Sequence, residues 1–189
     1  MSIDAAFTHF PSLTTERLHL RQIQQSDAEA FFVIKSDREV MDFYGDEIHQ
    51  SLEETHELIQ QFQDSFDRRE AIFWGITLKG EDTLIGTCTL LSFNFDFHYA
   101  ETGYELNPAY GRQGITSEAM GAILTYGFTE LELHRIEAVT DPRNTPSKSL
   151  LLKLGFTYEG NLRQRFFFRD QFLDANYFGL LKDEWLKSV

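Results

Sequence analysis

The chain is poor in cysteine, in long apolar runs and in basic residues, and each scarcity excludes a class of protein. Among its 189 residues there is one cysteine, Cys88, so no disulfide can form within the chain. No apolar run is long enough for a membrane span, and no signal-peptide pattern opens the sequence, so we expect a cytoplasmic protein without a membrane partner. Lys and Arg number 17 against 30 Asp and Glu, a formal net charge of −13. That charge repels a phosphate backbone, so we expect no nucleic-acid partner.

The motifs of common metal and nucleotide sites are missing as well. The six histidines show neither His-x-x-His nor HExxH spacing, so we predict no metal site. No GxGxxG follows a strand-like segment, and neither GxxxxGKS nor GxxxxGKT occurs. The sequence therefore argues against a Rossmann or Walker-type nucleotide site.

The chain does contain enough apolar material for a buried core. Hydrophobic residues make up 42% of it, and we expect residues 1–189 to form a single domain. Short apolar runs bounded by turn residues alternate with segments of helical periodicity, which predicts the order β-α-α-β-β-β-α-β-α-β-β. The predicted strands cover 17–23, 72–78, 83–91, 99–106, 135–140, 156–168 and 172–181.

Two capping signals predict where the first helices begin. Ser26 with Glu29, and Ser51 with Glu54, have the spacing of a capping box. Two further helices are predicted, one after a glycine-containing turn and a short one at 146–155.

That glycine-containing turn is the most informative segment of the chain. It joins a predicted strand to an amphipathic helix, and a turn of this kind exposes backbone N–H groups at the positive end of the helix dipole. Such an arrangement suits a phosphate or pyrophosphate. The turn consists of Gly111, Arg112, Gln113, Gly114, Ile115, Thr116 and Ser117.

Three segments flank the turn in a composite pattern. ETGYELNP precedes it at 101–108, NTPS follows at 144–147, and KLGF with a nearby EG pair lies at 153–160. Together they resemble the GNAT N-acetyltransferases, in particular the RimJ/RimL type that acetylates ribosomal-protein N-termini. The resemblance implies an α/β fold with a single mixed, mostly antiparallel twisted sheet, splayed central parallel strands and flanking helices. It also implies acetyl-CoA as the co-substrate.

The resemblance further implies roles for individual residues. The turn would bind the pyrophosphate, although Gly111 and Thr116 depart from the usual family pattern. The other cofactor-binding groups would be the backbone at Tyr104, Glu105 and Leu106, which pairs with pantetheine, and the side chains of Asn144 and Ser147. Ser147 would be the general acid for the leaving thiolate. From the residues alone, NTPS also fits an ordinary helix start with Thr145 as its N-cap.

The general base is harder to assign. The glutamate used by RimL-type enzymes corresponds to Phe166 here, so that carboxylate is missing. Glu101 and Glu105 are the predicted substitutes, because period-two alternation places both on one face of the strand that would hold acetyl-CoA. The eighteen phenylalanines, including Phe93, Phe95, Phe97 and the run at 166–168, are expected to be mostly core, and the alternative is that clusters in loops form the wall of an apolar acceptor pocket.

These inferences lead to an expected activity. We expect transfer of the acetyl group of acetyl-CoA to a primary amine, foremost a protein N-terminal amine. A small amine such as a polyamine, amino sugar or amino acid is the first alternative, and a non-catalytic acyl-CoA-binding module is the second. The sequence is compatible with a monomer or a homodimer.

Overall fold

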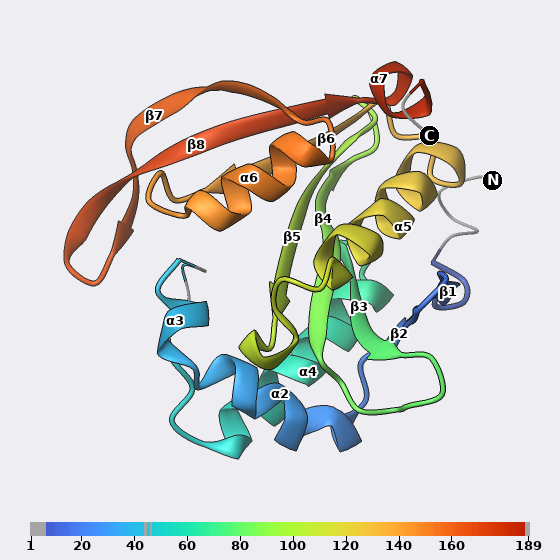
Figure 1. The fold of residues 1–189 in the computed structure, drawn as a ribbon, viewed down its shortest axis with the longest axis vertical. Helices are drawn as coiled ribbons and strands as arrows, with labels where there is room; N and C mark the ends of the chain where they lie inside the picture. Colours follow the sequence, from blue (N-terminus) through green and yellow to red (C-terminus); the bar gives the residue numbers. More distant parts are fainter. Residues whose placement is uncertain (1–6, 44, 46, 188–189) are drawn as a thin grey trace.

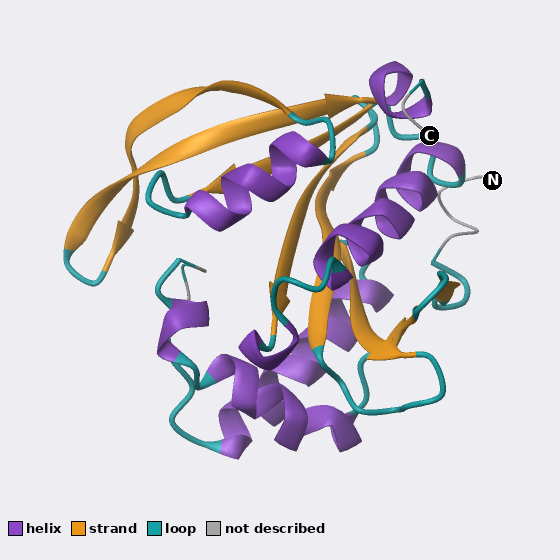
Figure 2. Ribbon diagram, in the orientation of Figure 1, coloured by secondary structure: helices purple, strands orange, loops and turns teal. Residues whose placement is uncertain are grey.

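The computed structural model describes residues 7–43, 45 and 47–187, and at its centre lies one mixed sheet (Figures 1 and 2). The strand order is β1-β2-β3-β4-β5-β6-β8-β7, and every neighbouring pair is antiparallel except the parallel pair β5 and β6. The strands are β1 Leu13–Thr14, β2 Leu18–Gln22, β3 Ala71–Leu78, β4 Gly86–Asn94, β5 Tyr99–Leu106, β6 Arg135–Thr140, β7 Thr157–Phe168 and β8 Gln171–Leu181.

Helices cover both faces of this sheet, with α5 on one face and α2 and α4 on the other (Figure 1). Within the described residues, no helix combines the length and apolar character needed to cross a membrane. The α-helices are α2 Ala28–Lys35, α3 Arg38–Met41, α4 Leu52–Asp67, α5 Ile115–Thr129, α6 Thr145–Lys153 and α7 Lys182–Leu186. Two 3-10 turns, η1 Gln25–Asp27 and η2 Pro108–Tyr110, complete the set.

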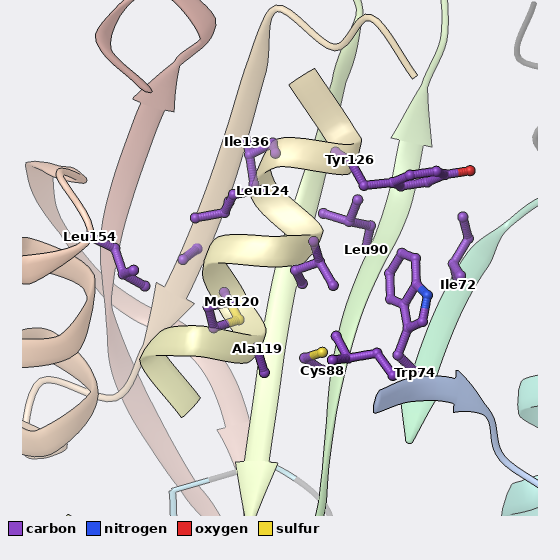
Figure 3. Packing of buried hydrophobic residues seen from close by; sticks show 14 of the residues in the cluster. Ile72, Trp74, Cys88, Leu90, Ala119, Met120, Leu124, Tyr126, Ile136 and Leu154 are labelled. Carbon is purple, nitrogen blue, oxygen red and sulfur yellow. The ribbon is translucent and has the colours of Figure 1, made fainter. Parts of the chain in front are cut away.

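The larger core lies between α5 and the sheet. Met120 and Leu124 of α5 belong to the same apolar cluster as Cys88 and Leu90 of β4 and Trp74 of β3 (Figure 3). All five side chains are fully buried. Burying a side chain of this size is worth about 1.5–3 kcal/mol, so this cluster fixes α5, and with it the turn at its N-terminus, against the sheet.

A second core lies on the opposite face. Phe31 and Ile34 of α2 pack with Ile59 of α4 and with Leu84. These apolar positions recur at helical spacing on α2, so one face of the helix is buried in this cluster, mainly against α4. The two cores together hold β3 between α5 on one face and α4 on the other.

The sequence-derived element order is confirmed for the principal strands and helices, but one capping prediction is wrong. Ser51 accepts the backbone N–H of Glu54 at 3.3 Å, as predicted. Ser26 instead lies inside η1 and makes no capping box with Glu29. The carboxylate of Asp27 accepts the backbone N–H three residues earlier at 2.7 Å and also binds a guanidinium of β2, so it organises this corner in place of the serine.

The two parallel strands diverge, as the predicted fold requires. Their register runs only from Tyr99 opposite Arg135 to Glu101 opposite Glu137. Beyond Glu101, no strand of the described residues pairs with β5 on the β6 side, while β6 stays paired with β8 (Figure 1). The sheet is therefore open at its centre, and the backbone groups of β5 that point into the opening are left for another partner.

Candidate functional site

The turn before α5 presents backbone N–H groups to a cavity of about 550 Å³, which we call the turn cavity. Gly114 is the N-cap of α5 and has φ +78°, a conformation that glycine adopts without steric cost. The first hydrogen bond of the helix runs from Glu118 N to Gly114 O, and no side chain of the described residues caps the N–H groups ahead of it. The lining includes Arg112, Gly114, Ile115, Thr116, Ser117 and Lys153.

Arg17 holds this turn from outside. Its Nε lies 2.6 Å from the Glu118 carboxylate, and its Nη1 donates to Gln113 O at 3.0 Å. Burial alone would raise the pKa of Glu118, but hydrogen bonds from Thr15 and Arg17 and the charge of Arg17 outweigh it and lower that pKa. The one acidic side chain in the first turn of α5 is thus paired away from the exposed N–H groups, so it does not oppose an anion there.

The opening between β5 and β6 forms a second cavity of about 370 Å³, which we call the strand cavity. It adjoins the turn cavity, because Tyr104, Glu105, Asn144 and Ser147 line both. The structure therefore brings the predicted residues of β5 and of α6 to one place. A path leads from the start of α5, along the edge of β5, into the middle of the sheet.

A pair of hydroxyl groups spans the strand cavity. The Tyr104 hydroxyl lies 2.7 Å from Ser147 Oγ, and either group can be the donor. Burial raises the pKa of Tyr104 to about 12, with the hydrogen bond to Ser147 acting in the opposite direction. The phenol is therefore protonated at neutral pH. Nothing local in the sequence indicates where the Tyr104 side chain lies, so the sequence predicts a role for the backbone of this residue only.

Asn144 is the N-cap of α6. Its Oδ1 accepts the backbone N–H of Ser147 at 3.0 Å, and helix α6 begins at Thr145. The prediction that a helix starts at NTPS is therefore confirmed, but its N-cap is Asn144 and not Thr145. The cap fixes the position of Ser147, and the Asn144 Nδ2 group has no partner among the described residues, so it remains available to a ligand.

Glu105 is engaged in a buried ion pair. Its Oε2 lies 3.0 Å from Lys35 Nζ, and its Oε1 accepts the Thr87 hydroxyl at 3.0 Å. Both charged side chains are 1% exposed. Lys35 is not among the residues predicted from the sequence, although a lysine directly after Ile34 on the apolar face of α2 is a signal that indicates a buried charge.

Glu101 lines the strand cavity together with Glu105 but is less buried. Burial raises the pKa of Glu101, the nearby charge of Glu137 raises it further, and Arg165 partly counteracts both. A raised pKa makes a carboxylate in a cavity wall a stronger proton acceptor than an exposed one.

A third cavity of about 300 Å³, the aromatic cavity, lies beyond Glu101. It shares Phe43, Glu101 and Thr140 with the strand cavity. Its other lining residues include Asp42, Asp141, Phe166, Phe167, Phe168, Leu173 and Asp174. The expectation that 166–168 is mostly core is wrong: Phe166 is 45% and Phe167 62% exposed, because β7 is the edge strand of the sheet.

Two of the carboxylates in the aromatic cavity are paired. The Asp141 carboxylate binds Arg143, whose hydrogen bond lowers the pKa of Asp141 despite partial burial. Asp42 lies 3.2 Å from Arg169. Within the described chain, no group of three or more His, Cys, Asp or Glu is placed to hold a metal ion.

Comparison with known proteins gives a consistent result. The family model for the acetyltransferase (GNAT) domain matches residues 17–157. The "Uncharacterized N-acetyltransferase YoaA" of Bacillus subtilis (strain 168) is 40% identical over 173 residues, which cover 92% of this chain and 98% of YoaA.

Two further similar proteins are named for different acceptors. The crystal structure of ribosomal-protein-S5-alanine acetyltransferase from Vibrio fischeri has a TM-score of 0.79 and 26% identity, covering 93% of this chain and 98% of that one. Spermidine N(1)-acetyltransferase of Vibrio cholerae is 25% identical over 171 residues, which cover 90% of this chain and 96% of the relative.

Proposed function

The chain belongs to the GNAT family of acetyl-CoA-dependent N-acetyltransferases, and on this premise we propose that it acetylates the terminal α-amine of a peptide or protein. One observation carries the proposal. The turn cavity, the strand cavity and the aromatic cavity adjoin in that order through shared residues, with Ser147 at the first junction and Glu101 at the second. A co-substrate and an acceptor entering from opposite ends would meet between these two side chains.

Acetyl-CoA supplies an activated acetyl thioester, and the residues present fit it. The uncapped N–H groups of Ile115, Thr116 and Ser117 suit the pyrophosphate. The edge of β5 beyond Glu101 has no strand partner on that side, so it can pair with the amides of pantetheine as an added strand would. The Nδ2 group of Asn144 is a further donor.

Ser147 is the proposed proton donor to the leaving thiolate. Its hydroxyl lines the strand cavity and is hydrogen-bonded to the Tyr104 phenol behind it. A hydroxyl is a weak acid, but the developing thiolate needs its proton only in the transition state. Tyr104 then positions Ser147 and can replace the proton that it gives up.

Glu101 is the proposed base, in preference to Glu105. If Glu105 accepted a proton, the buried ammonium of Lys35 would lose the charge that lies 3.0 Å from it, which is costly in the protein interior. Glu101 faces both cavities and its raised pKa suits proton uptake from an ammonium group.

The aromatic cavity favours a single terminal amine over a polyamine. Its acidic lining attracts a cation, but Arg143 and Arg169 already neutralise Asp141 and Asp42, so Asp174 and the proposed base Glu101 are the lining carboxylates that remain for an acceptor. Moreover, β7 ends the sheet, so the outer edge of that strand is available to the backbone of an extended peptide.

A panel of acceptors tests the proposal. The purified protein would be incubated with acetyl-CoA and one of four amines: a peptide with a free N-terminus, the same peptide blocked at its N-terminus but carrying lysine, spermidine, or glucosamine. We expect thiol release with the first peptide and an acetyl group on its α-amine by mass spectrometry. Acetylation of spermidine or glucosamine alone would contradict the peptide assignment, and binding of acetyl-CoA without transfer to any amine would favour the non-catalytic module.

A further inference from the structure

Thr140, the last residue of β6, carries a buried hydroxyl group that has no partner among the residues that the structure describes. The residue is 9% exposed, and its Oγ1 makes no hydrogen bond within the described part of the chain. A buried polar atom left in this state destabilises the folded protein, so it calls for an explanation.

The other buried threonines of the described residues show how unusual this is. Each has a hydrogen-bond partner: Thr55 with His49, Thr77 with His19 O, Thr87 with Glu105, Thr89 with Ile72 O, and Thr102 with Thr89 O. The fold therefore satisfies buried threonine hydroxyls as a rule. Thr140 differs from them in position, not in chemistry.

That position is the junction of two cavities. Thr140 lines both the strand cavity and the aromatic cavity, as Glu101 does. Because β6 separates from β5 after Glu137, Thr140 stands on the far side of the opening from the strand that would hold acetyl-CoA. An acceptor amine moving from the aromatic cavity toward a thioester would pass between Thr140 and Glu101.

The side chain can turn its hydroxyl toward this junction. In the structure Oγ1 is covered, although the residue itself borders both cavities. Rotation about χ1 to another staggered position would exchange Oγ1 with the methyl group. Since the covered position offers no partner within the described residues, a polar group in the junction would favour the exchanged rotamer.

We infer that the Thr140 hydroxyl is a specificity-determining group for the acceptor, an inference that rests on the proposed function. The acceptor enters as an ammonium ion, with one N–H donated to Thr140 Oγ1 and another to the Glu101 carboxylate, which takes up that proton. The remaining hydrogen bond to Thr140 then holds the neutral nitrogen at the entrance of the strand cavity, where the acetyl group would lie. Thr140 forms no covalent bond and moves no proton.

Thr140→Val tests this, because valine keeps the shape of threonine and removes only the hydroxyl. For an amine that the parent acetylates, we expect kcat/KM for the acceptor to fall about tenfold, the effect of one lost hydrogen bond. We expect unchanged acetyl-CoA affinity by calorimetry and a Tm equal to or above that of the parent, since an unsatisfied hydroxyl has been removed. Thr140→Ser keeps the hydroxyl that Thr140→Val removes, so the kcat/KM of the serine variant should lie within about threefold of the parent value.

Thr77→Val is the matched control. It makes the same change at a buried threonine that lines none of the three cavities and donates to His19 O at 3.1 Å. This variant should have a lower Tm than the parent, because it loses that hydrogen bond, and the same kcat/KM per folded molecule.

Three outcomes would overturn the inference. One is a parent-like kcat/KM for Thr140→Val, and another is a lowered Tm together with lowered acetyl-CoA affinity, which would mark the hydroxyl as structural. The third is failure of the parent to acetylate any amine of the panel, which would remove the proposed function and this inference with it. The first two leave the proposed function intact, so the failures are distinguishable.

Discussion

The Tyr104 hydroxyl lies 2.7 Å from Ser147 Oγ, and this contact joins β5 to the first turn of α6 across the opening in the sheet. Where β5 and β6 no longer share backbone hydrogen bonds, side chains from the two sides still meet. Burial raises the pKa of the Tyr104 phenol to about 12, so the phenol is protonated throughout the neutral pH range. The Ser147 hydroxyl therefore always has a protonated hydrogen-bond partner there. This geometry is the basis of the first prediction.

Ser147→Ala should lower kcat much more than it lowers acetyl-CoA affinity. A proton donor to the leaving thiolate acts in the transition state, and general acid catalysis contributes about 10²-fold or more. The rate of CoA thiol release at saturating substrates gives kcat, and calorimetry gives the affinity for acetyl-CoA. Tyr104→Phe is the matched variant: it keeps the ring, removes the hydroxyl behind Ser147, and should reduce kcat by less. A parent-like kcat for Ser147→Ala would leave water as the proton donor.

Gly114→Asp should weaken acetyl-CoA binding sharply. The change puts a negative charge and a side chain at the N-terminus of α5, where a pyrophosphate would need the exposed N–H groups. Gly80→Asp is the control, because Gly80 also has a positive φ, +84°, and lies in the turn between β3 and β4, outside the three cavities. The two variants carry the same charge change and similar backbone strain. Equal affinities by calorimetry would contradict the anion-binding role of the turn.

Glu101→Gln should depress acetylation at pH 7 and recover much of the rate near pH 9. A base is needed while the acceptor is an ammonium ion, and an α-amine with a pKa of about 7.7–8.0 is mostly neutral by pH 9. The measurement is kcat/KM as a function of pH for parent and variant. A profile for Glu101→Gln that follows the parent at every pH would exclude Glu101 as the base.

Glu137→Gln should shift the acidic limb of the parent profile to lower pH. Burial first, and then the negative charge of Glu137, raise the pKa of Glu101. Removing that like charge lowers the pKa, so Glu101 stays ionised, and active as a base, at lower pH. The same kcat/KM series measures the shift. An acidic limb that stays in place or moves to higher pH would contradict the assignment.

Glu105→Gln should lower the free energy of unfolding, because Glu105 belongs to the buried ion pair and is not the proposed base. The change removes the carboxylate charge 3.0 Å from the buried Lys35 ammonium, and breaking a buried pair in this way costs about 3–5 kcal/mol. Denaturant unfolding measures the loss. The double variant Lys35→Met with Glu105→Gln removes both charges and should regain most of the stability. A Glu105→Gln variant as stable as the parent would show that the pair is not important for the fold.

The sequence by itself determined the features that depend on neighbouring residues. Hydrophobic periodicity predicts the main strands and helices, and the turn predicted at 111–117 falls on the observed turn at 111–114 and the first residues of α5, which begins at Ile115. The Ser51–Glu54 cap was predicted correctly because capping is a contact over three residues. The motif at 144–147 also indicated a helix start, although it pointed to Thr145 and the structure uses Asn144.

The tertiary structure decided which distant side chains meet. Lys35 pairs with Glu105, and Tyr104 with Ser147, through packing of elements that are far apart in the chain. The phenylalanines at 166–168 have the composition of a core segment, yet β7 lies at the edge of the sheet, where few elements cover it. The Thr140 hydroxyl, which has no hydrogen-bond partner among the described residues, likewise lies on β6 beyond the point where its register with β5 ends. Periodicity reports which face of an element is apolar, whereas the partner opposite that face is set by sheet order and helix packing.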